Sequence, residues 1–146
     1  MLHMWKKVII CHFSLAVKLE EGQDKAPWAG GAWTHMAPEI HKAQKKGQQP
    51  FVTTSTDVYA AGVLFYELFS HHHPFVGEDE EILDPMKDSI IRSVQDEEPR
   101  DLSEEVPQRI RELIMSMLEK NPLKRAQIAD LLKYWEIDEC VVKLGF

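Results

Sequence analysis

The pattern of apolar residues predicts a chain that is mainly helical. Between Asp57 and Phe69 almost every residue is apolar, so no polar face remains. A helix that is apolar on all sides is normally buried, and we therefore expect this one at the centre of the core. Thr54, Ser55 or Thr56 is suited to cap its amino end, where the carboxylate of Asp57 also suits the positive end of the helix dipole.

Later segments carry apolar residues on one side only, as amphipathic helices do. One opens at Pro107, ends at Asn121-Pro122 and carries a stripe at i, i+3, i+4, i+7 and i+8, formed by Ile110, Leu113, Ile114, Met117 and Leu118. A last helix has the same spacing at Ile128, Leu131, Leu132 and Trp135. A further helix, whose start Pro85 places late, is indicated by Ile82, Met86, Ile90 and Val94.

The first third of the chain is less regular. Residues 7–11 are apolar and β-branched, which favours a strand, whereas residues 22–35 are rich in Gly, Pro and Trp and predict a long loop. Residues 36–43 predict a short helix, because Pro38 suits a first helical turn. The fold class predicted is mainly α, with a short extended segment at the N-terminus.

Composition places the chain among ordinary soluble globular proteins. Its 146 residues suffice for one domain with a core, with 44% hydrophobic and 28% charged residues. The net charge of −7 argues against nucleic acid as a partner. Cys11 and Cys140 form no Cys-x-x-Cys pair, which favours a reduced, cytoplasmic protein. No stretch approaches the roughly 20 apolar residues of a membrane span. The apolar run after Lys6-Lys7 loosely imitates a signal peptide but lacks a small-residue cleavage site.

Four short motifs then follow one another in a definite order. They are Met36-Ala37-Pro38-Glu39, Asp57-Val58-Tyr59-Ala60-Ala61-Gly62-Val63, His73-Pro74-Phe75, and Leu113 to Leu118 followed by Asn121-Pro122 and Arg125. In this order and spacing they resemble the landmarks of a eukaryotic-type protein kinase domain, from the Ala-Pro-Glu motif that closes the activation segment to the end of the C-lobe. The resemblance covers residues 7–136, and residues 59–75 resemble Ser/Thr kinases, among them the NIMA-related kinases.

The resemblance implies a helical domain like a kinase C-lobe. We expect one partial domain over residues 1–146, with an activation-segment-like part at 7–39, a helical core at 54–136 and a tail at 137–146. In the family, the Glu of Ala-Pro-Glu forms a buried ion pair with the late Arg. Carried over, Glu39 should pair with Arg125, and the alternative is that both are solvated surface charges.

The chain departs from the family at two places, and a third residue, Asp57, loses its usual role. His12-Phe13-Ser14 stands where the family has Asp-Phe-Gly. Imidazole nitrogen prefers zinc, copper or nickel, whereas Mg²⁺ prefers carboxylate oxygen, so we expect no metal or nucleotide cofactor at His12. Ala32 replaces the Thr of the family's Gly-Thr. Asp57, which anchors the catalytic loop in the family, is expected to act here as a structural charge at a helix start.

These features predict a non-catalytic, pseudokinase-like C-lobe. In the family, the Gly-rich loop, the Lys and the catalytic residues lie upstream of the activation segment, at which this sequence almost begins. We expect such a chain to bind a protein partner or to self-associate through exposed apolar surface, with no nucleic acid or membrane as partner. One alternative is a fragment of a longer, active Ser/Thr kinase. Another is an unrelated all-α binding domain.

Two other features have more than one interpretation. His71-His72-His73 is similar to a metal-binding tract, but a polar loop after the buried helix explains it better, and we prefer that interpretation. Trp5, Trp28 and Trp33 are suited either to packing or to stacking on a ligand.

Overall fold

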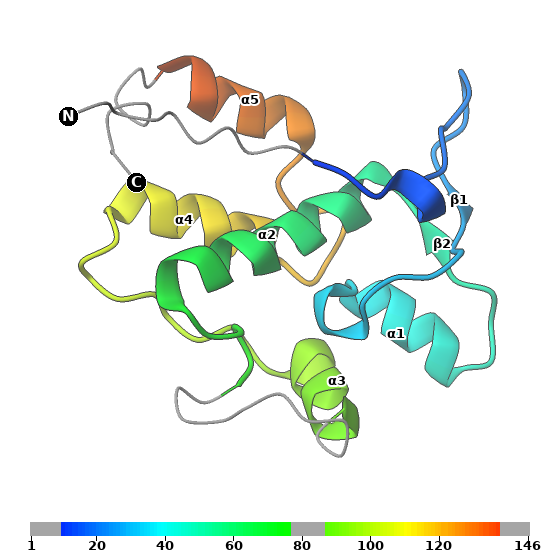
Figure 1. Cartoon of the computed structure of the whole chain (residues 1–146), viewed down its shortest axis with the longest axis horizontal. Helices are drawn as coiled ribbons and strands as arrows, with labels where there is room; N and C mark the ends of the chain where they lie inside the picture. The colour runs from blue at the N-terminus through cyan, green and yellow to red at the C-terminus, as the bar shows by residue number, and fades with distance from the viewer. Residues whose placement is uncertain (1–9, 77–86, 138–146) are drawn as a thin grey trace.

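The computed structural model describes residues 10–76 and 87–137. Its elements in chain order are the 3-10 turn η1 (Phe13–Leu15), β1 (Ala26–Pro27), the 3-10 turn η2 (Trp33–His35), α1 (Pro38–Lys45), β2 (Phe51–Val52), α2 (Thr54–Ser70), α3 (Lys87–Asp96), α4 (Gln108–Met117) and α5 (Ile128–Ile137). Figure 1 shows the long helix α2 crossing the middle of the molecule, with α4 and α5 on one side and α1 and α3 on the other. The mainly helical fold class is confirmed.

The extended structure differs from the prediction. The two short strands pair antiparallel, with Ala26 opposite Val52 and Pro27 opposite Phe51. The segment predicted to be a long loop therefore contains β1 and η2. Residues 10 and 11 belong to no strand, and the rest of the strand predicted at residues 7–11 lies outside the described residues.

Helix α2 supplies the centre of the core. Tyr59 and Val63 have no exposed surface. The buried apolar residues around them come from several helices and from the segments that join them: Ala37, Ile40, Tyr66, Phe75, Val76, Ile90, Val94, Leu102, Val106, Ile114 and Leu118. Gly62 lets α4 approach closely, because a Cβ atom at this position would lie only 2.9 Å from Cβ of Met117. Any larger residue at position 62 would push the two helices apart.

One side of α2 is not buried, contrary to the sequence prediction. Leu64 is 48%, Phe65 41% and Leu68 61% exposed. These residues follow one another at i, i+1 and i+4, so they lie on one face of the helix. We call Leu64, Phe65 and Leu68 the α2 stripe. Among the described residues, no element buries it.

The amino end of α2 is built differently from the prediction, because the residue in the N-cap position is Thr53. Its backbone N–H donates to Oγ1 of Thr56 over 3.0 Å, and the Thr56 hydroxyl donates to the Thr53 carbonyl over 2.6 Å. The hydroxyl of Ser55 turns away and donates to the carbonyl of Pro122 over 3.2 Å. The cap therefore lies one residue earlier, and Ser55 is free to contact a distant part of the chain.

The other helices follow the predicted stripes, with two differences. Ile90 and Val94 of α3 are buried as predicted, while Ile82 and Met86 lie outside the described residues. Helix α4 ends at Met117, before the predicted end at Asn121. Beyond this end, the carbonyl of Asn121 accepts from the backbone N–H groups of Lys124 and Arg125, both over 2.9 Å, so Asn121 begins a separate turn.

In α5, the apolar residues Ile128 and Leu132 are 46% and 59% exposed. The stripe of this helix is therefore only partly used for packing, unlike that of α4. Within the described ranges, no helix combines the length and the apolar content that a bilayer crossing requires.

Candidate functional site

The guanidinium of Arg125 lies where three parts of the chain meet. Its side chain has no exposed surface, and Nη1 lies 2.8 Å from Oε1 of Glu39. A second bond joins Nη2 to Oε2 of Glu39 over 3.0 Å, so the contact is bidentate. Glu39 lies in the first turn of α1 and keeps 25% of its side chain exposed. The two residues that the sequence pointed to thus form a largely buried pair.

The remaining N–H groups of Arg125 are also used. Nη1 donates to the carbonyl of Ser55 at the start of α2 over 2.8 Å. Nε donates to the carbonyl of Glu119 over 2.7 Å, and Nη2 to that of Lys120 over 3.3 Å. All five donors of the guanidinium therefore have acceptors. A buried cation is tolerated under these conditions, because each lost contact with water is replaced.

An aromatic ring also contacts the guanidinium of Arg125. The guanidinium carbon of Arg125 lies 4.9 Å from the ring centroid of Tyr59, which is within the range of a cation–π contact. Burial raises the pKa of the Tyr59 hydroxyl far above its usual range, so the phenol stays neutral. Arg125 therefore joins α1, the start of α2 and the segment after α4 at one point.

The degenerate metal motif lies on the surface. His12 has left-handed backbone angles, with φ 66°, and its Nε2 lies 3.2 Å from Oγ of Ser14. Phe13 is 65% exposed. No group of three or more metal-ligating side chains occurs in the part of the chain that the structure describes. Ala32 precedes η2 as its N-cap residue and makes no side-chain cap bond.

Asp57 lies in the first turn of α2, exposed to solvent. Partial desolvation raises the pKa of its carboxyl. Within residues 10–76 and 87–137 its carboxylate has no hydrogen bond or ion pair. The structure thus places Asp57 as a charged residue in the first turn of α2, at the amino end of this helix.

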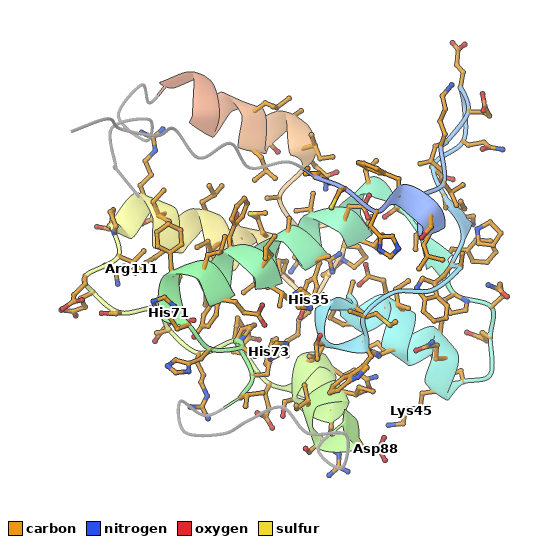
Figure 2. All side chains as sticks on the ribbon, viewed as in Figure 1. His35, Lys45, His71, His73, Asp88 and Arg111 are labelled. Carbon is orange, nitrogen blue, oxygen red and sulfur yellow. The ribbon has the colours of Figure 1, made fainter. Side chains whose placement is uncertain are left out.

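The three consecutive histidines differ in burial. His73 is buried, and its Nε2 donates to the carbonyl of Thr34 over 2.9 Å, while its Nδ1 accepts from the backbone N–H of Phe75 over 3.3 Å. His35 lies nearby, with Nε2 3.2 Å from Oε2 of Glu67 (Figure 2). His71 is exposed. His73 is therefore a structural histidine that joins the end of α2 to η2.

Sequence reasoning did not resolve the tryptophans, and it missed two buried polar residues, one on α1 and one on α3. Trp28 and Trp33 are partly buried and pack against the core, while Trp5 lies outside the described residues. His41 and Gln95 are buried polar residues on α1 and α3. The burial of His41 and Gln95 could not be predicted, because helix faces are recognised from apolar residues at i, i+3 and i+4, and polar side chains do not contribute to that pattern.

We predict that Arg125→Glu destabilises the chain by about 3–5 kcal/mol, because Glu39 is left beside a second buried carboxylate. The chain should unfold or aggregate, which thermal melting followed by circular dichroism would detect. The exposed neighbour Lys124 offers a matched control, since Lys124→Glu makes a similar charge change without a buried partner. An unchanged melting temperature for Arg125→Glu would contradict the anchoring role.

We predict that acid destabilises the chain through His73. Burial lowers the pKa of this imidazole below its ordinary value of 6.5, and the charge of His35 lowers it a little further. The hydrogen bond to the Thr34 carbonyl and the charge of Glu67 raise the pKa, but by less. The unfolded chain then takes up the proton first, so stability is complete above pH 6.5 and is lost as the pH falls below it.

The fall in melting temperature between about pH 7.5 and about pH 5.5 should therefore be smaller for His73→Gln than for the natural chain. His71→Gln, at the exposed neighbour, should leave the pH dependence as it is. Equal pH dependence in the natural chain and in His73→Gln would contradict this assignment.

Comparison with known proteins places this geometry in a family. Residues 1–135 match the family described as "Protein kinase domain". Rhodopsin kinase GRK1 of Rattus norvegicus is 31% identical over 122 residues, which are 83% of this chain and 20% of the relative. The calcium/calmodulin-dependent protein kinase type II alpha chain of Drosophila melanogaster is 31% identical over 129 residues, which are 87% of this chain and 22% of the relative.

A solved structure agrees with this family assignment. The chain superimposes on the twitchin kinase region from C. elegans with a TM-score of 0.62 and 25% sequence identity, covering 84% of this chain and 20% of that one. The chain thus spans about a fifth of the length of the curated relatives it matches. The assignment to NIMA-related kinases stays a prediction. The chain belongs to the protein kinase domain family and carries the helical, C-lobe-like part of a domain that resembles those of Ser/Thr kinases.

Proposed function

We propose that this chain is a pseudokinase-like module that binds protein and does not itself transfer phosphate. The observation that carries the proposal is the α2 stripe. The central helix of the fold, whose other side is the core, presents Leu64, Phe65 and Leu68 at 41–61% exposure. Adjacent exposed apolar residues of this size usually mark a protein contact surface.

The altered residues support the non-catalytic half of the proposal. Phosphoryl transfer needs Mg²⁺ to bridge the phosphates and neutralise the developing charge. The residue at the metal-binding position is His12, whose imidazole suits softer metals than Mg²⁺. It lies exposed beside Ser14, with which it makes a local contact.

The occupant that we propose for the α2 stripe is a second copy of the chain. The stripe carries no charge, so two copies can meet there around a two-fold axis without burying an unpaired ion. The apolar residues Ile128 and Leu132 of the neighbouring helix α5 are exposed as well and offer further area. A cytoplasmic location belongs to this proposal, and the free thiol of Cys11 supports it.

We predict that the purified chain is a dimer in size-exclusion chromatography with light scattering, and that Leu68→Glu converts it to a monomer. The reason is that the substitution places a carboxylate within the proposed contact, where it would lose water without gaining a partner. Leu123→Glu is the matched control, because Leu123 is 92% exposed and lies outside the stripe.

Leu123→Glu should stay dimeric. A natural chain that is monomeric at concentrations of about 50 μM, well above the dissociation constant of an ordinary stable interface, would contradict self-association. So would a Leu68→Glu variant that remains a dimer.

A second function is favoured by the comparisons. The matched relatives are kinases of which this chain spans about a fifth, so the chain can also be part of a longer, active Ser/Thr kinase. The rest of that polypeptide would then cover the α2 stripe, and the isolated chain would not form a defined dimer. Codons in frame before Met1 for a Gly-rich loop, a Lys and a His-Arg-Asp motif would favour this function over the first.

A further inference from the structure

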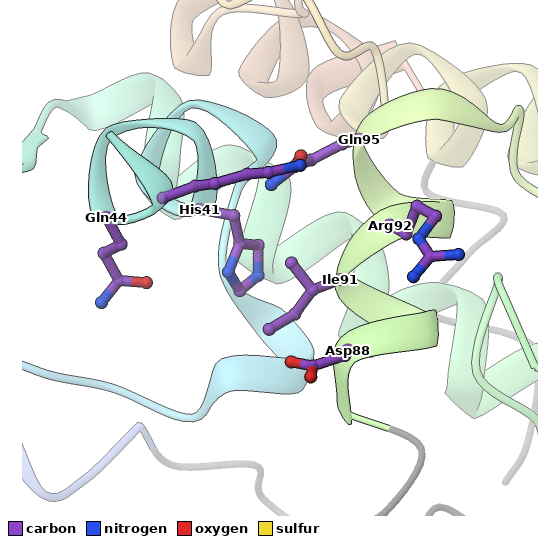
Figure 3. Close-up of a pocket in the computed structure, with 7 residues that line it drawn as sticks. His41, Gln44, Asp88, Ile91, Arg92 and Gln95 are labelled. Atoms are coloured by element: carbon purple, nitrogen blue, oxygen red, sulfur yellow. The ribbon is translucent and has the colours of Figure 1, made fainter. Parts of the chain in front are cut away.

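A pocket of about 400 Å³ lies between α1 and α3, on elements that do not carry the α2 stripe. Its walls are two helix faces, each with the spacing of one side of a helix. Helix α1 contributes His41, Gln44 and Lys45, and α3 contributes Asp88, Ile91, Arg92 and Gln95 (Figure 3). The volume falls in the lower part of the range of small-ligand sites.

The floor of the pocket holds an unused hydrogen-bond donor. Gln95 is 9% exposed, and its Nε2 is buried without a partner among the described residues. Figure 3 shows its side chain extending from α3 towards α1. A buried donor without an acceptor costs roughly 1–3 kcal/mol, so an acceptor that enters the pocket would be bound favourably. His41 does not compete for this acceptor through Nε2, which lies 3.1 Å from the carbonyl of Trp33.

Positively charged residues gather at the end of α1. Lys42, Lys45 and Lys46 follow one another there, all three are exposed, and Lys45 lines the pocket. We call them the basic edge. None of them forms an ion pair within the described parts of the chain, and the carboxylate of α1, Glu39, is taken up by Arg125. In a chain with a net charge of −7, this concentration of unpaired cations favours an acidic ligand.

The two features together select a carboxylate. One of its oxygens can accept from Gln95 Nε2 on the floor while Lys45 at the rim pairs with its charge. A phosphate dianion fits less well, because the buried donor is neutral and Asp88 also borders the pocket. We propose that the pocket between α1 and α3 binds an acidic side chain of a peptide segment from a protein partner.

This site and the α2 stripe are separate, so one can fail without the other. The test uses the ¹⁵N-labelled chain and a short polyglutamate peptide as the probe, followed by nuclear magnetic resonance. The expected result is saturable binding that shifts the side-chain amide signals of Gln95. Lys45→Glu should weaken binding by about ten-fold or more, because it reverses the charge that faces the carboxylate.

Two further variants separate a site from general attraction. Lys124→Glu makes the same charge change at an exposed lysine on another part of the molecule and should weaken binding less than about two-fold, which salt screening allows. Gln95→Leu should weaken binding several-fold without lowering the melting temperature, because it removes a buried donor that has no partner.

Four results would overturn the proposal. They are the absence of binding, equal weakening by Lys45→Glu and Lys124→Glu, unshifted Gln95 amide signals at saturation, and tighter binding of inorganic phosphate than of polyglutamate. The last result would instead assign the pocket to phosphate groups.

Discussion

A buried positive charge governs how this chain is held together. Arg125 gives all five of its N–H groups to acceptors from α1, from the start of α2 and from the segment after α4. Moving a guanidinium out of water is costly, and the cost is offset only when every donor has a partner. The three parts of the chain must therefore be in place together, so the anchor sets their relative positions rather than adding a small increment to each.

Two surfaces outside this anchor differ in character, namely the α2 stripe and the pocket between α1 and α3. On one side α2 packs into the core through Tyr59, Val63 and Tyr66. Its other side carries Leu64, Phe65 and Leu68, which are exposed. On the other side α1, held by Glu39, faces α3 across the pocket that contains Gln95. The family fold is thus retained where Arg125 holds it. The exposed apolar α2 stripe and the pocket with the unpaired donor of Gln95 are the surfaces that we propose to bind partners.

The sequence predicted the helices well because their apolar stripes repeat with the helical period, and the family motifs pointed to Glu39 and Arg125. It could not place the cap at Thr53, because several adjacent Thr and Ser residues satisfy the same rule. It placed the end of α4 too late, because the apolar stripe runs on to Leu118 and the next stop signal, Asn121-Pro122, lies beyond the observed end at Met117. It called α2 buried on every side because composition does not tell which neighbours are present. The burial of Gln95 could not be predicted, because a polar residue does not contribute to the apolar periodicity of a helix.

The central claim is that the anchored kinase-like fold persists without the chemistry of nucleotide and magnesium. Thermal melting of the purified chain with and without millimolar MgATP tests it most directly, because a ligand that binds only the native state raises the melting temperature. With His12 in place of a carboxylate, the melting temperature should stay unchanged. A saturable rise of several degrees would show a nucleotide site on this chain and contradict the account.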